Sequence, residues 1–256
     1  MIKIVTLLLS FFISTKCELE PFIVGGNFTN IESHPHSAFL TVTCVSSDGA
    51  RNVWICGASI INQRLLLTAA HCVADCTASS NITINVGSED NNKGFATTAH
   101  SFLVHENYVA SRVQFDIALI KTRATLNFSD KVSRVVLLNH PPKVTTAQLA
   151  GWGLVNEFQN LMSPLLKTIE QKVWSRIDCV KILGPLPAGT LCAGSPSSND
   201  YAAPGDSGSA LLIQDYIQIG LVSYKVPFIS RSLIVYTDVG YYYNWIEKHT
   251  KTLYCA

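Results

Sequence analysis

The sequence predicts an all-β protein built as barrels or sandwiches, and three observations support this class. Short β-branched and aliphatic runs recur between turn residues along the whole chain. Helical periodicity is convincing only at Tyr242–Thr250 and weaker at Ser175–Leu183. Pro141-Pro142 lies near the middle and favours a crossover between two halves. The 256 residues, 48% of them hydrophobic, suffice for one large domain or for two small barrels that share an interface.

The predicted strands are apolar runs of strand length bounded by turns. In the first half of the chain they are Ala38–Val45, Val53–Ile61, Leu65–Thr68, Ile82–Val86 and Ile117–Lys121. In the second half they are Gln148–Gly151, Ile169–Trp174, Ala210–Ile213, Ile217–Tyr224 and Leu233–Thr237. Many short strands at regular spacing are typical of barrels and sandwiches.

The N-terminus has the pattern of a secretory signal peptide. Met1-Ile2-Lys3 gives a positive start, and Ile4–Ile13 is an apolar run too short to span a bilayer. Small residues at Thr15 and Cys17 place the cut after Cys17, so residues 1–17 are predicted to be the signal peptide and the mature protein to be secreted and extracellular. The net charge of +1 gives no strong attraction to nucleic acid or to anionic membranes, and neither is an expected partner.

Secretion makes disulfides the expected state of the cysteines. The chain has eight, at positions 17, 44, 56, 72, 76, 179, 192 and 255. None has the paired short spacing and nearby histidines of a zinc site, so no metal is expected. Glycosylation sequons stand at Asn27, Asn81 and Asn127, as in many secreted chains.

Three short motifs carry the residue types of nucleophilic catalysis. His71 lies in Leu67–Cys72, Asp116 in Phe115–Leu119, and Ser207 in Gly205-Asp206-Ser207-Gly208. A serine hydroxyl needs an imidazole to take its proton and a carboxylate to orient that imidazole. It also needs backbone N–H donors where the oxyanion develops. Each motif alone is compatible with a turn or a half-buried residue, whereas the three together indicate a hydrolase.

The sequence resembles the secreted serine peptidases of the trypsin and chymotrypsin family. The resemblance runs from Ile23 to about His249. Besides the three motifs, it is carried by Ile23–Gly26, Gly151–Gly153, Val222–Tyr224, Val235–Thr237 and Asn244–Ile246. It implies two antiparallel six-stranded β-barrels with the active site between them and a C-terminal helix, in a peptidase domain of residues 23–256.

Position by position, the resemblance implies a complete catalytic apparatus. His71 corresponds to the general base, Asp116 to its orienting carboxylate and Ser207 to the nucleophile. The N–H groups of Gly205 and Ser207 correspond to the oxyanion hole, and Ser223 supports the aspartate from behind. Ser209 and Ala210 depart from the usual Gly-Pro after the nucleophile motif, but they lie beyond the oxyanion donors.

The resemblance also implies part of the disulfide pattern. Cys56–Cys72 would staple the histidine loop and Cys179–Cys192 the second barrel, each worth roughly 2–4 kcal/mol. Elimination then makes Cys44–Cys76 the expected third pair and leaves Cys255 unpaired once Cys17 departs.

Activation is expected at the Phe22-Ile23 bond, after a short propeptide of residues 18–22. In the family the new α-amino group, here of Ile23, folds inward and pairs with the acidic residue before the nucleophile, here Asp206. The family more often has Arg or Lys before this bond. Phe22, preceded by Pro21, therefore predicts a chymotrypsin-like activator or another copy of this chain.

The specificity pocket departs furthest from the family pattern. The base position falls on Tyr201, or on Asp200 if the alignment slips by one residue, which would give a trypsin-like base. Ser223 and Tyr224 enter the pocket, and its wall positions, often Gly, fall on Lys225 and Ile234. A pocket narrowed in this way favours cleavage after small or medium apolar residues.

The rim of the same pocket lacks a covalent bond that is common in the family. Ala203 stands where relatives commonly have a half-cystine, and the partner expected after Tyr224 is absent too. The simplest interpretation is a lost bridge.

The sequence therefore predicts a secreted serine endopeptidase made as a zymogen. It needs no cofactor, acts as a monomer on protein or peptide substrates, and has protein inhibitors of peptidases as candidate partners. The alternative is a weakly active or inactive homologue that binds a partner through a closed pocket. A calcium site at Glu89 and Asp90 is less favoured than a solvated turn, because the loop is short.

Overall fold

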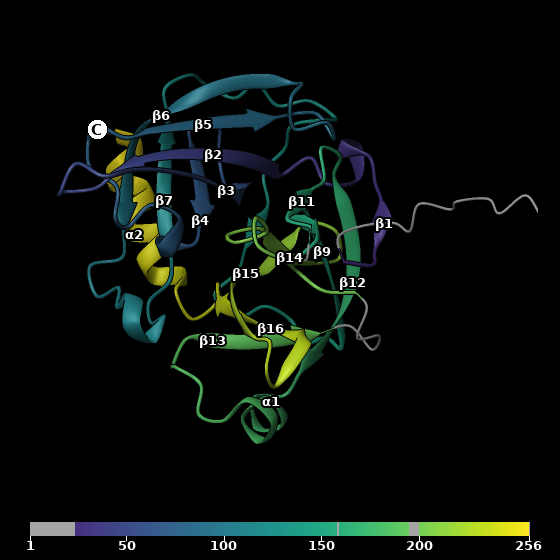
Figure 1. Ribbon diagram of the computed structural model, residues 1–256. Coiled ribbons are helices and arrows are strands. Elements are labelled where there is room, and N and C mark those ends of the chain that lie inside the picture. The colour runs from purple at the N-terminus through teal and green to yellow at the C-terminus, as the bar shows by residue number, and fades with distance from the viewer. Residues whose placement is uncertain (1–23, 158, 195–199, 256) are drawn as a thin grey trace, which may run out of the picture.

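Two β-barrels, formed one after the other along the chain, make up the fold (Figure 1). The computed structural model describes residues 24–157, 159–194 and 200–255. The predicted signal peptide and propeptide, and Ile23, lie outside the described residues.

The first barrel is a closed sheet of six antiparallel strands in the order β2-β3-β4-β7-β6-β5. Its inner face follows the period-2 alternation of the sequence, since Ala38, Leu40, Val42 and Cys44 of β2 are all buried. The strands are β2 (Ser37–Val45), β3 (Arg51–Ile60), β4 (Leu65–Thr68), β5 (Asn81–Val86), β6 (Phe95–Val104) and β7 (Ala118–Thr122).

The second barrel also closes through six strands, because β9 pairs with both β12 and β14. The remaining pairs run β12-β13-β16-β15-β14. These strands are β9 (Thr146–Gly151), β12 (Lys167–Trp174), β13 (Thr190–Gly194), β14 (Ala210–Ile213), β15 (Ile217–Val226) and β16 (Ser230–Asp238). The two-stranded hairpin of β10 (Leu154–Asn156) and β11 (Leu161–Met162) stands beside it, and β1 (Asn27–Phe28) and β8 (Val136–Leu137) extend the sheet.

Helices contribute little to either core. α1 (Arg176–Leu183) begins after Ser175, whose hydroxyl accepts the N–H of Asp178 as an N-cap. α2 (Tyr243–Cys255) lies beside the first barrel in Figure 1. The single-turn 3-10 helices are η1 (Ile31–Ser33), η2 (Ala70–Cys72) and η3 (Ala110–Arg112). No helix in the described residues has the length and apolar character of a membrane-crossing segment.

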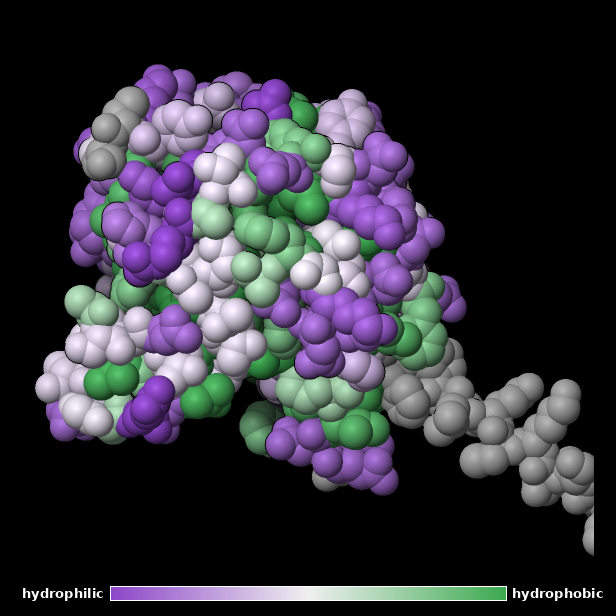
Figure 2. Space-filling view, turned by 90° about the horizontal axis from the view of Figure 1, so that it is seen from above, coloured by the Kyte–Doolittle hydropathy of each residue, from purple (hydrophilic) through white to green (hydrophobic). Residues whose placement is uncertain are grey.

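The two barrels share an apolar interface that also contains buried polar contacts. Leu67 and Leu119 of the first barrel belong to the same buried cluster as Leu212 and Leu221 of the second. At the same interface the Ser59 hydroxyl donates to the Gln218 side chain at 2.7 Å. On the face shown in Figure 2, hydrophobic and polar residues are interspersed. The predicted architecture of two six-stranded barrels with a C-terminal helix is thereby confirmed.

Within the described residues, three disulfides stabilise these barrels. Cys44–Cys76 and Cys56–Cys72 lie in the first barrel, and Cys179–Cys192 joins α1 to β13. These are the pairings that the resemblance and elimination led us to expect. The side chain of Cys255 lies outside the described part.

Two buried histidines just before β2, His34 and His36, should make the stability of the fold sensitive to acid. Burial lowers the pKa of His34 to about 4 and that of His36 to about 3, and neither ring gains an anionic hydrogen-bond partner in the described residues. Below pH 6.5 the unfolded chain takes up protons that the folded chain does not, so stability falls as the pH falls toward 3. At pH 5 the loss from His36 alone is about 2 kcal/mol.

The prediction is checked by denaturant unfolding of His36→Gln at pH 7 and pH 5. The loss of stability between these two pH values should be smaller in the variant than in the parent. The exposed His100→Gln is the matched control and should keep the parent's pH dependence. An unchanged dependence in His36→Gln would contradict the assignment.

Candidate active site

His71 and Asp116 form a directly bonded pair between the barrels. His71 lies in η2, immediately after β4, and Asp116 lies just before β7. The imidazole Nδ1 is 2.9 Å from Asp116 Oδ2, and the backbone N–H of His71 donates to Asp116 Oδ1 at 2.9 Å. The carboxylate is 2% exposed, whereas the imidazole is 30% exposed, so its other nitrogen can face a reacting group.

The pKa values of His71 and Asp116 suit a general base, because the protonated form of His71 is stabilised by Asp116. Burial disfavours the charged imidazole, but the hydrogen bond and negative charge of Asp116 outweigh it, so the pKa of His71 lies above its ordinary value. For Asp116, burial is likewise outweighed by the contacts with His71 and Ser223, and its pKa is lowered. The carboxylate therefore remains ionised at neutral pH and stabilises an imidazolium.

Asp116 receives hydrogen bonds at both its carboxylate and its backbone carbonyl oxygen. The Ser223 hydroxyl donates to Oδ2 at 2.5 Å, and the Thr237 hydroxyl donates to the Asp116 carbonyl oxygen at 2.7 Å. The preceding residue, Phe115, has a φ of 56°, an unusual conformation for a residue with a side chain. Its ring packs against His105 at 4.9 Å between centroids, which helps to hold this turn.

Ser207 lies on the loop between β13 and β14 and is bound to the first barrel. The N–H of Gly57 donates to the Ser207 carbonyl oxygen at 2.8 Å, and Cys72 Sγ lies 3.7 Å from the same oxygen. These contacts bring the serine to the histidine turn. The structure thus places Ser207, through its carbonyl oxygen, beside the turn that carries His71, and His71 in turn contacts Asp116.

The loop before Ser207 leaves two backbone donors available. Gly205 has a φ of 101°, and a Cβ there would lie 2.8 Å from Ile55 Cδ1, so the turn requires glycine. The N–H groups of Asp206 and Gly208 donate to carbonyl oxygens within the fold. Those of Gly205 and Ser207 have no acceptor among the residues that the structure describes. This pattern fits the predicted oxyanion hole.

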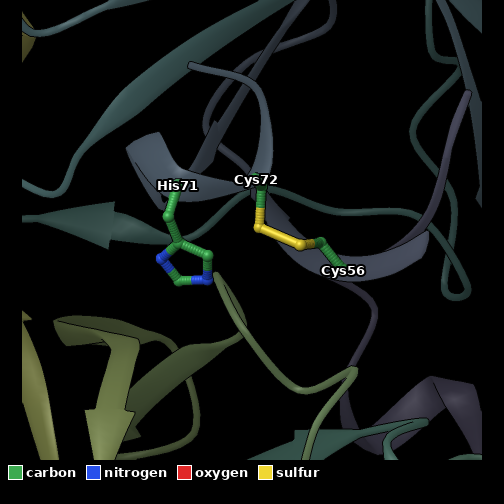
Figure 3. A group of neighbouring side chains, drawn as sticks. All are labelled: Cys56, His71 and Cys72. Atoms are coloured by element: carbon green, nitrogen blue, oxygen red, sulfur yellow. A yellow bond between two sulfur atoms is a disulfide. The ribbon is translucent and has the colours of Figure 1, made fainter. Parts of the chain in front are cut away.

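The histidine turn is fixed by a disulfide and is not a metal site. Figure 3 shows His71 beside Cys72, whose Sγ is bonded to that of Cys56. The ligand atoms of these three residues lie within 4.8 Å of one another. Because the two sulfurs are joined to each other, they are not thiolates, which are the form that binds metals.

Asp206 is fully buried beside the nucleophile. Its carboxylate accepts the N–H of Gly153 at 2.8 Å and that of Ala203 at 2.9 Å. Burial raises its pKa to about 6, although these hydrogen bonds and the charges of Lys225 and Lys167 act in the opposite direction. A carboxylate in this environment favours a further cation. Its predicted partner, Ile23, lies outside the described residues.

The N-terminal segment contacts β12 and the segment that precedes the nucleophile. Val24 forms an isolated bridge with Tyr201, whose N–H donates to the Val24 carbonyl oxygen at 3.0 Å. The fully buried Lys167 donates to the Gly25 carbonyl oxygen at 2.7 Å. The Asp200 carboxylate accepts the N–H of Gly26 at 3.1 Å, so it faces this segment.

A cavity of about 210 Å³ opens beside the nucleophile and has a mainly apolar lining. It includes four of the five predicted pocket residues. Neither Tyr201 nor Asp200 belongs to the described lining, which favours neither as its base. The lining consists of Ser207 with Ala202, Ala203, Pro204, Val222, Ser223, Tyr224, Lys225 and Ile234.

Lys225 and Ile234 are direct cross-strand partners on β15 and β16. The Lys225 ammonium makes an ion pair with Glu157, next to β10, and lies 4.5 Å from the centroid of the Tyr201 ring. Sequence reasoning missed Glu157, because nothing in the sequence indicates that this hairpin residue meets the pocket strand.

Removing the Ser223 hydroxyl, which donates to Asp116, should lower the activity of the site without abolishing it. In Ser223→Ala the carboxylate loses a hydrogen bond but keeps both contacts with His71, so we expect kcat/KM to fall about tenfold, the equivalent of one hydrogen bond to a charged group. The pKa of His71, read from the dependence of kcat/KM on pH, should shift as well. Ser230→Ala, on the β15–β16 hairpin, is the control, and equal losses in both variants would contradict the role.

Two six-stranded barrels that bring a histidine, an aspartate and a serine together at their interface define the chymotrypsin-like serine peptidase class of fold. The family model "Trypsin" matches residues 23–246, and the chain belongs to this family. A chymotrypsin from Phaedon cochleariae is 30% identical over 250 residues, covering 91% of this chain and 85% of that protein. A trypsin from Sarcophaga bullata is 30% identical over 248 residues and 92% of each chain.

Solved structures of two relatives have the same fold. An inactivated protease paralogue of the scabies mite, S-D1, superposes with a TM-score of 0.76 at 25% identity, over 89% of this chain and 97% of that one. HL collagenase superposes with a TM-score of 0.75 at 23% identity, over 88% and 97% of the two chains. The same fold thus occurs in a protein that is described as an inactivated protease paralogue.

Proposed function

We propose that this chain is a secreted serine endopeptidase that hydrolyses peptide bonds through an acyl-enzyme on Ser207. The observation that carries the proposal is the hydrogen bond of 2.9 Å between His71 and the buried Asp116, near a serine whose loop has two backbone donors without acceptors among the described residues. His71 takes the proton of the Ser207 hydroxyl as that oxygen attacks the carbonyl carbon. The N–H groups of Gly205 and Ser207 then stabilise the oxyanion.

The substrate is a protein or peptide with a small or medium apolar residue before the cleaved bond. The cavity beside Ser207 has about 210 Å³ and a mainly apolar lining, which suits a short aliphatic side chain. The described lining residues include no carboxylate that would attract Lys or Arg. We further propose a monomer, glycosylated at the exposed Asn27, Asn81 and Asn127, with protein inhibitors as partners.

The chain is made as a zymogen in this proposal. Cleavage of Phe22-Ile23 frees an α-amino group that pairs with Asp206, whose pKa is raised to about 6 by burial and whose ionised form a further cation would stabilise. Lys167 binds Gly25 and Asp200 binds Gly26, and these contacts would help to position the preceding Ile23 for the pairing with Asp206. An aromatic residue before the cleaved bond favours a chymotrypsin-like activator.

The second candidate is a binding homologue with little hydrolytic activity. It is favoured by the likeness to the inactivated scabies mite paralogue and by Lys225 and Ile234, which narrow the cavity. The complete set of His71, Asp116 and Ser207 favours the enzyme.

Chymotrypsin cleavage of the purified precursor, followed by a fluorophosphonate probe and a peptide library, tests the two candidates. An endopeptidase is labelled at Ser207 and cleaves after small apolar residues once Ile23 is exposed. Absence of both labelling and cleavage would favour the binding homologue. Activation by trypsin at the same bond would contradict the proposed activator.

A further inference from the structure

The wall of the candidate specificity cavity contains a lysine whose charge is bound elsewhere. Lys225 lines the cavity, but its ammonium is ion-paired with Glu157, which is not part of the described lining. The ammonium also donates to the Ala202 carbonyl oxygen at 3.3 Å and lies over the Tyr201 ring. The carbon chain of Lys225 therefore bounds the cavity while its charge is anchored behind it.

This anchor is largely shielded from water. The side chains of Lys225 and Glu157 are 14% and 29% exposed. Removing one partner of a shielded pair leaves a charge that must find water or another partner. Tyr201 and Arg231 lie close to the pair: burial and, to a smaller extent, the charge of Glu157 raise the pKa of Tyr201, whereas the charge of Arg231 lowers it.

The pair also connects three separate segments. Lys225 belongs to β15, Glu157 follows β10, and Ala202 belongs to the nucleophile loop. The adjacent Ala203 stands where the family commonly has a half-cystine that ties this loop to the pocket rim. An ion pair and a hydrogen bond thus join elements that relatives join covalently.

We propose that the Lys225–Glu157 pair sets the depth and the charge of the specificity cavity. Lys225 is a specificity-determining residue that contacts the substrate side chain, and Glu157 is a positioning residue that keeps the ammonium out of the cavity. This inference rests on the proposed peptidase function and deepens it. It assigns the selection of small apolar residues to a particular contact.

Two substitutions should change the selected residue in different directions. Lys225→Ala removes the side chain that bounds the cavity, so larger residues can enter. Glu157→Gln leaves the lysine in place but removes its anionic partner, so the ammonium is free to turn toward a carboxylate in the cavity. The first variant should gain cleavage after phenylalanine, and the second should gain cleavage after glutamate.

The experiment uses the full chain after cleavage at Phe22-Ile23, with peptides that differ only in valine, phenylalanine or glutamate before the scissile bond. We expect Lys225→Ala to raise the Phe:Val ratio of kcat/KM at least about tenfold, a change typical of differences in pocket size. Glu157→Gln should raise the Glu:Val ratio about tenfold through KM, and Glu157→Asp should restore the parental ratio. Glu247→Gln, which breaks the Glu247–Lys251 pair of α2, is the control and should leave both ratios unchanged.

A parallel measurement keeps this inference separate from the proposed function. In a Ser207→Ala background, calorimetry measures how tightly the same peptides bind, without any need for hydrolysis. In Ser207→Ala alone, and combined with Lys225→Ala or Glu157→Gln, the relative affinities for the three peptides should change in the same direction as the kcat/KM ratios. Unchanged ratios and unchanged relative affinities in Lys225→Ala and Glu157→Gln would overturn the inference. A chain that shows the shifts in affinity but no labelling or hydrolysis would sustain it and refute the peptidase.

Discussion

Ser207→Ala is expected to reduce kcat/KM by a factor of about 10⁴ or more and to abolish labelling by a fluorophosphonate. The variant lacks the atom that forms the acyl-enzyme, so His71 has no hydroxyl to activate. The fold should be kept, because the contacts with Gly57 and Cys72 are made by the Ser207 carbonyl oxygen and not by its side chain. Thermal unfolding should therefore be close to that of the parent.

Ser209→Ala is the matched control for this substitution. Ser209 is buried two positions further along the same loop, and its hydroxyl packs where a Cβ on Gly57 would lie. Its loss should leave labelling intact. If Ser207→Ala keeps its hydrolytic activity, or if Ser209→Ala loses labelling while folded, the assignment of the nucleophile is wrong.

Much of the fold could be predicted because its strands are strongly patterned. The run Ala38–Val45 became β2 with one added residue, and Ser175–Leu183 became α1 with Ser175 as its cap. β6 was missed, since its half-exposed Ala, Thr and His residues give no apolar alternation. β13 was missed as well, because its small residues have low strand propensity and the strand depends on pairing with β12 and β16.

The candidate catalytic residues His71, Asp116 and Ser207 could be selected from the sequence because each lies in a short motif, whereas the geometry of the pocket could not be predicted. Its cavity depends on where the Lys225 side chain turns, and that is decided by Glu157, 68 residues away in the sequence. Tyr201 and Asp200, the two candidates for the base of the pocket, are adjacent in the sequence. The structure distinguishes their surroundings, because Asp200 binds the N-terminal segment and Tyr201 lies beneath the Lys225 ammonium. Such long-range contacts leave no local pattern.

Asp206→Asn is expected to reduce activity by about 10²-fold or more without unfolding the chain, a loss similar to that of an oxyanion donor. Both carboxylate oxygens accept backbone N–H groups, from Gly153 and Ala203, and an amide replaces one acceptor with a donor. A Cβ on Gly153 would lie 2.4 Å from Asp206 Oδ2, so the close approach leaves no room for rearrangement. The loop that carries Gly205 and Ser207 should lose its order, seen as slower fluorophosphonate labelling. The exposed Asp215→Asn is the control and should keep full activity.

The pH dependence of stability distinguishes the role of Asp206 as partner of the new N-terminus from a merely structural role. The pKa of Asp206 is about 6 in the fold against an ordinary value of 3.8, so its contribution to stability is present below pH 3.8 and is lost as the pH rises through 6. The loss above pH 6 is about 3 kcal/mol in the uncut chain. Cleavage at Phe22-Ile23 supplies an ammonium that lowers this pKa, so the cut chain should keep its stability over the same range. Denaturant unfolding of both forms between pH 4 and pH 7 measures the difference. Equal pH dependence in the cut and uncut chains would show that Asp206 is not the partner of the new N-terminus.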